Sequence, residues 1–394
     1  MSKVSISVIS SIEEISRKDW NRCAIAENNK FSKFLDPFTS YDFLHALEKS
    51  GSVGKISGWL PYHLIVKNNS EILGVMPLYL KLNSQGEYIF DHNWADAYYR
   101  IGKNYYPKLQ SSVPFSPVTG RRFLSTIGNK KLVREALISF LKNHIKVNKI
   151  SSFHITFCDE DEYFFGKSND LLGRETIQYH WKNNNYSSFE DFLNCLSSRK
   201  RKNIKKEREK AKAFGGKIKT LTGEYIKKDH WNYFWDFYQD TGNRKWGTPY
   251  LTRSFFDLIH ENMSDDILLV LAEKDDIPIA GALHFIGSKT LYGRYWGTNE
   301  YNPFLHYELC YYQAIDYALK HKLQSVEAGA QGEHKIARGY NPVKTFSLHF
   351  FENLRFNKVI DDYLEKEKKY NSREISEIEK FLPYKNERKN NGKI

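Results

Sequence analysis

The densest group of chemically active residue types lies in residues 327–342, which read EAGAQGEHKIARGYNP. This stretch follows a short apolar segment at residues 323–326, for which we predict a buried strand. Ligands of α/β sheets usually bind outside the carboxyl end of a strand, so the position favours a site. Its three glycines would let the backbone approach a ligand closely and present N–H groups to an anion. The alternative interpretation is a polar turn between two strands.

The side chains of this stretch divide into two chemical groups. Lys335 and Arg338 are cations that can hold an anion or a developing oxyanion. Glu327, Glu333 and His334 are titratable and can assist the removal of a proton from an amine. We also predict that the stretch contacts substrate through Gln331, Gly332, Gly339 and Tyr340.

A second candidate stretch, residues 292–297, reads YGRYWG. Its alternation predicts a strand that carries Arg294 and Trp296 on one face. An arginine among aromatic side chains can hold a phosphate or a carboxylate, and we assign Arg294 to the same anion-holding role. An aromatic core strand with one arginine at its edge is the alternative. We expect His306 and Glu308, just ahead of the next helix, to face the same cleft.

A proline-rich loop at residues 112–122 ends in Arg121 and Arg122. A rigid loop that carries two arginines could meet an anionic substrate. A loop whose charges are simply solvated fits the sequence as well. We therefore name both arginines as candidates for substrate binding.

The net charge of +12 is concentrated in two segments. Residues 199–219 contain eleven Lys or Arg and two Glu, and the tail at residues 382–394 supplies the remaining excess. Helix-forming residues from 198 to 214 predict a helix with a basic ridge, ended by Gly215 and Gly216. Such a local concentration of charge favours an anionic partner, either a polyanionic donor or a membrane-attached acceptor. The residues predicted to contact it are Arg201, Lys202, Lys205 and Arg208.

An internal repeat organises the elements that must position these residues. Residues 63–80 and 267–285 each read as strand, polar turn and strand. Helical periodicity follows at residues 132–144 and 307–319, and each helix leads into an apolar strand at residues 149–157 and 323–329. The repetition predicts a duplicated mixed α/β (α+β) fold, in which each mixed sheet is flanked by helices. The predicted domains are residues 1–180, a basic helical segment at 181–220, residues 221–375, and a basic tail at 376–394.

Several classes of protein do not fit the sequence. No apolar run reaches the ~20 residues that span a bilayer, and no secretory signal precedes the first strand. The four scattered cysteines favour neither a disulfide framework nor a zinc site, so we expect a cytoplasmic protein without a metal. Phosphate-loop, serine-elbow and zinc-protease motifs are absent from the sequence.

Six motifs taken together resemble the FemAB-like predicted N-acyltransferase family. They lie at residues 48–54, 58–63, 114–122, 198–208, 292–297 and 327–340, and the resemblance runs from about residue 30 to about residue 375. It implies tandem GNAT-like domains and the transfer of an acyl or aminoacyl group to an amine, among them that of a cell-wall peptidoglycan precursor. The implied co-substrate is an aminoacyl-tRNA or an acyl-CoA, and no permanently bound cofactor is implied.

Two other functions remain open from the sequence. A non-catalytic nucleic-acid-binding protein would use the basic helix alone, although Phe214 is the only aromatic residue near that run. A peripheral membrane or cell-wall recognition protein on a degenerate GNAT scaffold would bind without turnover.

Overall fold

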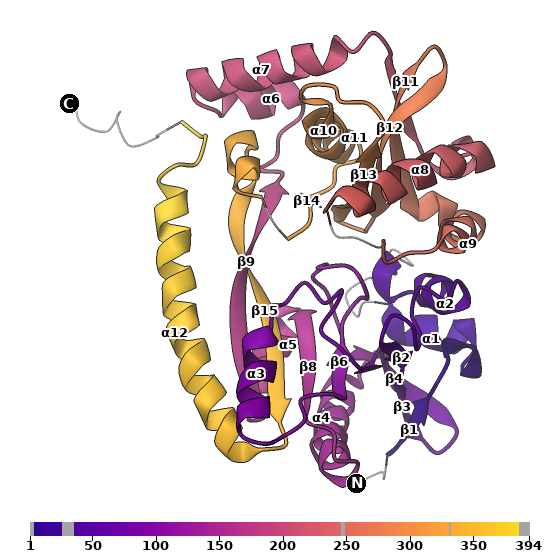
Figure 1. Ribbon diagram of the computed structural model, residues 1–394, viewed down its shortest axis with the longest axis vertical. Helices are drawn as coiled ribbons and strands as arrows, with labels where there is room; N and C mark the ends of the chain where they lie inside the picture. Colours follow the sequence, from indigo (N-terminus) through magenta and orange to yellow (C-terminus); the bar gives the residue numbers. More distant parts are fainter. Residues whose placement is uncertain (1–3, 26–34, 246–248, 331, 386–394) are drawn as a thin grey trace, which may run out of the picture. The chain divides into compact units, whose positions relative to one another are not determined.

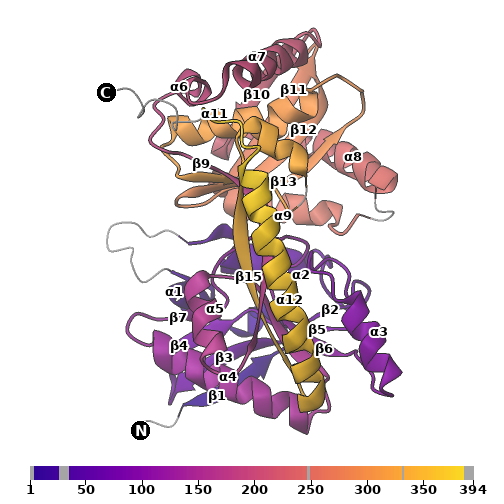
Figure 2. The ribbon, with the colours of Figure 1, turned by 90° about the vertical axis from the view of Figure 1, so that its left-hand side faces the viewer.

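The computed structural model describes residues 4–25, 35–245, 249–330 and 332–385 (Figures 1 and 2). It divides into two compact units. Unit 1 comprises Met1–Thr176, Tyr250–Met263 and Lys344–Ser372, and unit 2 comprises Ile177–Pro249, Ser264–Val343 and Arg373–Ile394. These units differ from the predicted contiguous ranges, because the chain passes between the units several times. The predicted separate basic segment, residues 181–220, belongs to unit 2.

Unit 1 contains two sets of strands. Strands β1 (Ser5–Ile9), β3 (His63–Asn68), β4 (Glu71–Met76) and β7 (Leu124–Ser125) form an antiparallel sheet in the order β1-β3-β4-β7. A second set runs in the order β15-β8-β6-β5-β2, from β15 (Asn341–Phe351) through β8 (Ser152–Cys158), β6 (Lys108–Ser111) and β5 (Tyr79–Lys81) to β2 (Trp59–Pro61). Only β6 and β8 pair in parallel within this set.

Helices cover the sheets of unit 1. They are α1 (Arg17–Ala24), α2 (Tyr41–Lys49), α3 (His92–Arg100), α4 (Lys130–Val147), α5 (Glu160–Lys167), α9 (Arg253–Met263) and most of α12 (Leu354–Glu379). Apolar residues of α4 recur at helical spacing, and Val133, Leu137 and Leu141 are buried against Leu64 and Val66 of β3. This burial of one face accounts for the helix that its periodicity predicted.

The strands of unit 2 run in the order β10-β11-β12-β13-β14-β9. These are β10 (Lys217–Leu221), β11 (Ile267–Lys274), β12 (Ile277–Ile286), β13 (Thr290–Thr298), β14 (Ser325–Glu327) and β9 (Leu172–Lys182), whose first residues belong to unit 1. The helices of unit 2 are α6 (Phe189–Asn194), α7 (Ser198–Lys212), α8 (Lys228–Lys245), α10 (Leu305–Tyr307) and α11 (Gln313–Lys320). A π-helical turn at Glu308–Tyr312 joins α10 to α11, and a 3₁₀ helix at Glu333–Arg338 precedes β15.

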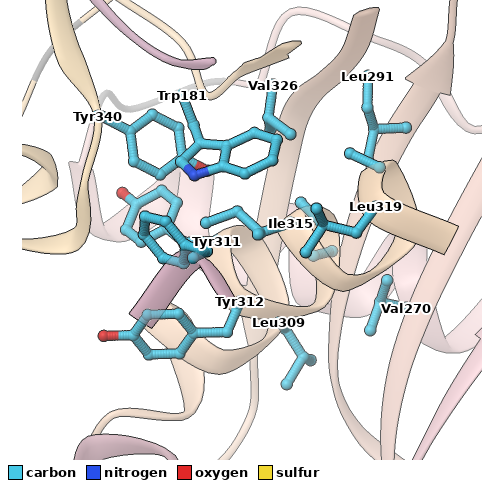
Figure 3. Close-up of a cluster of buried hydrophobic side chains, with 14 of the residues drawn as sticks. Trp181, Val270, Leu291, Leu309, Tyr311, Tyr312, Ile315, Leu319, Val326 and Tyr340 are labelled. Carbon is cyan, nitrogen blue, oxygen red and sulfur yellow. The ribbon is translucent and has the colours of Figure 1, made fainter. Parts of the chain in front are cut away.

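The sheet of unit 2 packs against apolar side chains on both of its faces. Val270 of β11 and Leu291 of β13 pack with Leu309 and Ile315 of the helix on one face (Figure 3). On the other face, α8 approaches so closely that a Cβ at Gly297 would lie 2.1 Å from the Phe237 carbonyl oxygen. Successive side chains of a strand point to opposite faces, so β11 and β12 are buried on both.

The predicted repeat is present in both units. Hairpin β3–β4, helix α4 and strand β8 form one copy, and hairpin β11–β12, the α10–α11 helix and β14 form the other. Asn69 has a φ of 53° in the first turn, and Asp275 and Asp276 have φ of 52° and 60° in the second. Asn and Asp tolerate this left-handed backbone, which the short hairpin turns require. The duplication predicted from the sequence is therefore confirmed.

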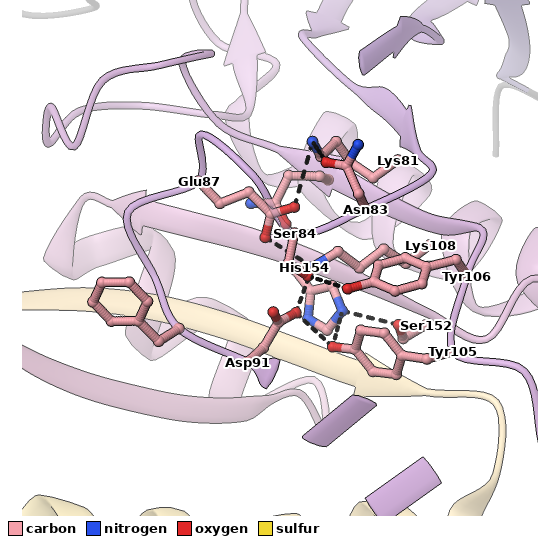
Figure 4. Close-up of polar contacts among 12 residues, drawn as sticks. Lys81, Asn83, Ser84, Glu87, Asp91, Tyr105, Tyr106, Lys108, Ser152 and His154 are labelled. Atoms are coloured by element: carbon pink, nitrogen blue, oxygen red, sulfur yellow. Dashed lines mark hydrogen bonds and ion pairs between the residues drawn. The ribbon is translucent and has the colours of Figure 1, made fainter. Parts of the chain in front are cut away.

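The insertion of the first copy, residues 86–130, folds around a buried polar network (Figure 4). Lys108 is fully buried and forms ion pairs with Glu87 at 2.7 Å and with Asp91. Burial alone would lower the pKa of Lys108, but the two carboxylates raise it. His154 lies on β8, the strand of the first copy that corresponds to β14 of the second copy. It is buried between Ser152 and His349.

None of the helices described in this chain is long and apolar enough to cross a membrane.

Candidate functional site

The site of unit 2 begins where two parallel strands separate. Strands β13 and β14 pair only at Thr290–Ser325, Leu291–Val326 and Tyr292–Glu327. Beyond these pairs β13 continues to Thr298, whereas the chain after Glu327 leaves the sheet. On its other side, β13 pairs with β12 through a register shift at Leu283 and His284. The separation and the irregular pairing together open the sheet at Gly293–Trp296.

A small cavity of about 90 Å³ occupies this opening. It is lined by Ala282, Leu283 and His284 of β12, by Gly293, Arg294, Tyr295 and Trp296 of β13, and by His306, Cys310, Tyr311 and Ala328. Burial lowers the pKa of His284 to about 4, so its ring is neutral at pH 7. We call this space the inner cavity.

A larger pocket of about 320 Å³ shares two walls with the inner cavity. The shared residues are Trp296 and His306, whose rings meet edge to face with centroids 5.1 Å apart. The rest of its lining is Thr298, Glu300, Tyr301, Asn302, Pro303, Phe304, Leu305 and Tyr307. We call it the outer pocket; Trp296 and His306 line both spaces.

Lys335 lies on the 3₁₀ helix that follows the loop after β14. Its side chain is buried, and Nζ donates a hydrogen bond to the carbonyl oxygen of Gly329 at 2.9 Å. Burial, with a smaller contribution from the guanidinium of Arg294, lowers the pKa of Lys335 to about 7. Lys335 therefore exchanges its proton near neutral pH, which an exposed lysine does not.

Arg294 and Glu327 form a buried ion pair at the rim of the inner cavity. Arg294 Nη2 lies 3.3 Å from Glu327 Oε2, and their side chains are 2% and 6% exposed. His180 of β9 lies 3.9 Å from the other carboxylate oxygen of Glu327. The pair crosses from β13 to β14 at the last point where the strands are hydrogen-bonded. It fixes the guanidinium beside the opening.

Arg338 has a partner that the sequence did not reveal. Glu207 of α7 binds its guanidinium through two hydrogen bonds of 2.9 and 3.1 Å, and Tyr312 donates a third to the same carboxylate at 2.5 Å. The guanidinium also lies 3.5 Å from the ring centroid of Tyr307, a wall of the outer pocket. Arg338 is thus held by protein groups behind the pocket and does not line it.

The other predicted residues of the 327–340 loop occupy varied positions. His334 is exposed, and its Nε2 is 2.9 Å from the Tyr311 hydroxyl. Glu333 is exposed and Tyr340 is buried. Gly332 and Gly339 have φ of 116° and 87°, a region that side chains rarely adopt. Gln331 lies outside the described residues.

Two predictions of position were wrong. Glu308 does not face the cleft, because it is fully buried and holds Arg208 through hydrogen bonds of 2.9 and 3.1 Å. Arg122 is also fully buried, and its guanidinium donates to the carbonyl oxygens of Val118, Gly120, Arg121 and Thr156. The guanidinium of Arg121 donates to the carbonyl oxygen of Ala24. Both arginines belong to unit 1 and support its loops.

Helix α7 exists as predicted, but its basic ridge is divided. Ser188 caps the preceding α6, Ile204 and Ala211 are buried as the apolar stripe, and α7 ends before Gly215. Arg208 turns inward to Glu308 and to Asp316 at 2.6 Å. Arg201 donates to Asn194, and Lys205 pairs with Glu190, both on α6. Of the four predicted polyanion contacts, only Lys202 has no ion pair or hydrogen bond with another described side chain.

Sequence reasoning missed His284, Cys310, Tyr311 and Glu207. His284 stood in a strand read only as apolar, and its place at the inner cavity depends on the register shift between β12 and β13. Glu207 stood in a basic run and was counted only toward its net charge. Among the described residues, no three His, Cys, Asp or Glu side chains are placed to hold a metal ion.

Comparison with known proteins shows the family to which this chain belongs. The family model described as peptidoglycan biosynthesis/recognition, FemAB-like, matches residues 11–386. The chain belongs to the FemAB-like family. FemX has a solved structure with a TM-score of 0.54 at 14% identity, covering 88% of this chain and 98% of that one. The likeness to FemX supports the mixed α/β fold predicted from the sequence.

Two other solved structures are similar at lower scores. A tandem GNAT protein from the clavulanic acid biosynthesis pathway has a TM-score of 0.47 at 9% identity and covers 89% of this chain and 99% of that chain. L-PGS from Bacillus licheniformis has a TM-score of 0.48 at 8% identity, with 79% and 91% covered. No curated protein matches the sequence.

Proposed function

We propose that this FemAB-like protein is an N-acyltransferase that moves an acyl or aminoacyl group to the amine of a peptidoglycan precursor. The observation that carries the proposal is the placement of Lys335. A buried lysine with a pKa of about 7 lies on the 3₁₀ helix that follows β14, and the guanidinium of Arg294, which lines the inner cavity, contributes to that lowered pKa. A strongly perturbed pKa next to a cavity is typical of catalytic sites.

The proposed reaction is a direct attack of the neutral amine on the acyl carbonyl carbon. The new C–N bond places negative charge on the carbonyl oxygen, and protonated Lys335 together with Arg294 opposes that charge. Collapse of the tetrahedral species breaks the bond to the leaving group of the donor. We assign acceptance of the amine proton to His334, because its ring is exposed while Tyr311 orients it.

The other predicted bases have less suitable surroundings. Glu327 is already neutralised by Arg294, whereas Glu333 is exposed and, unlike His334, has no hydrogen bond with another described side chain. Arg338 supports the site from behind through Tyr307 and does not hold the oxyanion itself. These placements revise the roles predicted from the sequence for Glu327, Glu333 and Arg338.

The co-substrate in this proposal is an aminoacyl-tRNA or an acyl-CoA. Both carry their acyl group at the end of a phosphorylated nucleotide, and neither needs a resident cofactor or metal. The acceptor is a soluble or membrane-attached precursor with a free amine, met in the cytoplasm or at the inner surface of the membrane. The inner cavity of about 90 Å³ holds the acyl group.

A binding protein without turnover is the second candidate. It is favoured by the ion pairs that occupy Arg338 and Arg208, two cations that an enzyme could have used for substrate. Such a protein would bind the precursor or the nucleotide and release both unchanged.

Mass spectrometry of the acceptor after incubation with each donor separates the two candidates. The wild-type protein should acylate a peptidoglycan precursor that has a free amine. Lys335→Met should slow transfer by about 10²-fold or more, the scale of losing one group that stabilises an oxyanion. Lys320→Met, an exposed lysine of the same unit, is the matched control and should transfer normally. Binding of precursor without any acylated product would support the recognition protein.

A further inference from the structure

The outer pocket has an unusual lining that the proposed chemistry does not use. Five of its residues carry aromatic rings, namely Trp296, Tyr301, Phe304, His306 and Tyr307. Tyr301 is 90% exposed, so its ring is open to a ligand. Phe304 has a left-handed φ of 65°, which a bulky residue adopts only where its surroundings hold it. Asn302 places its amide Nδ2 in the same wall, buried and without a hydrogen-bond partner in the described structure.

A cationic surface of α7 is also unexplained. Arg199, Lys202, Lys206 and Lys210 recur at intervals of three and four residues, so they share one face of the helix. All four side chains are exposed, and none forms an ion pair with a residue that the structure describes. We call this set the free face of α7. It lies apart from Arg201 and Lys205, which bind α6.

The free face and the outer pocket meet at Lys210. Its Nζ lies 5.8 Å from the ring centroid of Phe304. Arg338 covers the ring of Tyr307 at 3.5 Å, so cations border the aromatic wall at two places. With a rise of 1.5 Å per residue, the row from Lys210 to Lys202 leads away from the pocket over about 12 Å. Aromatic rings and a row of cations therefore form one continuous surface within unit 2.

We propose that this surface binds a nucleotide, whose planar base stacks in the outer pocket and whose phosphates lie along Lys210, Lys206 and Lys202. Stacking suits any base because each has a flat π-face, and lysines bind phosphates by charge. The Asn302 amide supplies a donor to the edge of the base. Arginine and lysine next to an aromatic pocket disfavour a cationic ligand and favour an anionic one.

This inference rests on the proposed function, since the nucleotide is the part of the donor to which the acyl group is attached, directly in an aminoacyl-tRNA and through the pantetheine arm in an acyl-CoA. Trp296 and His306 line both spaces, so the outer pocket adjoins the inner cavity to which the proposed function assigns the acyl group. The two donors share this nucleotide chemistry. They differ in length, because an RNA strand can follow the whole cationic row, whereas coenzyme A reaches only its beginning.

Equilibrium binding of two probes tests the surface. One probe is a fluorescent single-stranded RNA of about ten nucleotides that ends in adenosine, within the usual site sizes of such surfaces. The other is coenzyme A, followed by calorimetry. The first variant is the triple substitution Lys202→Gln, Lys206→Gln and Lys210→Gln. Its charge-matched control is Arg201→Gln, Lys205→Gln and Lys212→Gln on the same helix, and Tyr301→Ala removes the exposed ring.

The expected result is a selective loss. The free-face triple should weaken the probe that binds by about tenfold or more, and should reduce the slope of log affinity against log salt by about 2. Tyr301→Ala should weaken it by about tenfold, the scale of one lost stacking contact. The charge-matched control should change affinity by less than about twofold. Loss with RNA assigns an RNA-borne donor, and loss with coenzyme A assigns an acyl-CoA.

Equal losses in the free-face triple and in its control, or no loss in either triple, would overturn the proposal. Binding of neither probe to the wild-type protein would overturn it as well. Failure of the proposed function is distinguishable, because these measurements need no turnover. If transfer proceeds and the variants bind normally, only the nucleotide surface is wrong. If the variants lose binding and no transfer occurs, only the transferase is wrong.

Discussion

Lys335 is charged below pH 7 and neutral above it, because burial and Arg294 lower its pKa from 10.5 to about 7. An oxyanion is opposed only by the charged form. We therefore expect the rate constant for transfer to fall as pH rises through about 7. Lys335→Arg keeps its charge at every accessible pH, so its profile should lose this alkaline decline. The measurement is kcat/KM against pH from 5.5 to 9.5 for the two proteins, roughly the range over which such a group titrates.

The opposite sign would assign Lys335 another role. If the rate of the wild-type protein rises through pH 7 and that of Lys335→Arg does not, the neutral amine of Lys335 acts as a base and the assignment to His334 is wrong. The same titration affects stability with a defined sign. Between pH 7 and 10.5 the unfolded chain binds more protons at this position than the native chain, so its contribution to stability rises with pH in that window.

At the scale of single residues, the sequence indicated candidate residues but not the contacts that they make. Residue types and strand position were enough to name Lys335, Arg294, Trp296 and His306 as candidates. Partners were not predictable, because Glu207 lies more than a hundred residues from Arg338 and no local pattern joins them. The burial of Arg122 and Glu308 was equally unpredictable from the sequence. Charged residues are rarely buried, and only tertiary contacts reveal the exceptions.

At the scale of elements, α7 is attached to the site by a carboxylate. Glu207 joins the helix to Arg338 of the 3₁₀ helix and to Tyr312 of the π-helical turn. Glu207→Gln removes the charge that balances a guanidinium whose side chain is 7% exposed. We expect a loss of about 3 kcal/mol in the free energy of unfolding, the scale of breaking a buried pair on one side.

The kinetics of the Glu207→Gln variant show whether Glu207 positions the 3₁₀ helix or only stabilises the fold. The Glu207→Gln variant should lower kcat more than it raises KM, because the 3₁₀ helix that carries Lys335 loses its anchor. Glu209→Gln removes the same charge from an exposed position on the same helix and is the matched control. Denaturant unfolding and steady-state kinetics on both variants make the comparison. Identical behaviour of the two variants would show that Glu207 holds nothing in place.

The elements themselves were largely predictable. Alternation and turn residues indicated both hairpins, and helical spacing indicated α4 and α7, because each pattern is local. The π-helical turn at Glu308–Tyr312 was not predictable, since Glu308 and Tyr312 contact Arg208 and Glu207 of another helix and no local pattern shows those contacts. The sequence also did not predict how short the pairing of β13 with β14 is, because it too depends on contacts between distant segments.

At the scale of the whole molecule, each unit has a polar arrangement of its own, and that of unit 1 is buried. Lys108→Met would leave Asp91 and Glu87 without the cation that they share. We expect a loss of about 3–5 kcal/mol in the free energy of unfolding, because uncompensated buried charge is costly. Lys103→Met, exposed in the same insertion, should be close to neutral. Chemical denaturation measures both, and equal stabilities would mean that the network contributes little.

The duplication was readable from the sequence, but the division of the chain was not. Hairpin, helix and strand recur as local patterns, so the amino-acid sequence alone is enough to recognise the repeat. The units draw on segments far apart in sequence, such as Tyr250–Met263 and Lys344–Ser372 in unit 1. Which unit such a segment joins depends on which apolar faces pack together. The periodicity within a segment does not show which distant segment it packs against.

The central claim is that the donor occupies the inner cavity of unit 2, and Cys310 offers a direct measurement. Cys310 lines that cavity, whereas Cys195 of the same unit is exposed outside it. Alkylation of both thiols can be followed by peptide mass spectrometry with and without donor, in the absence of acceptor. With donor at about ten times its Kd, Cys310 should react about tenfold more slowly, because only the unliganded fraction remains accessible. Cys195 should react unchanged. A bound donor that leaves the rate at Cys310 unaltered would contradict the site.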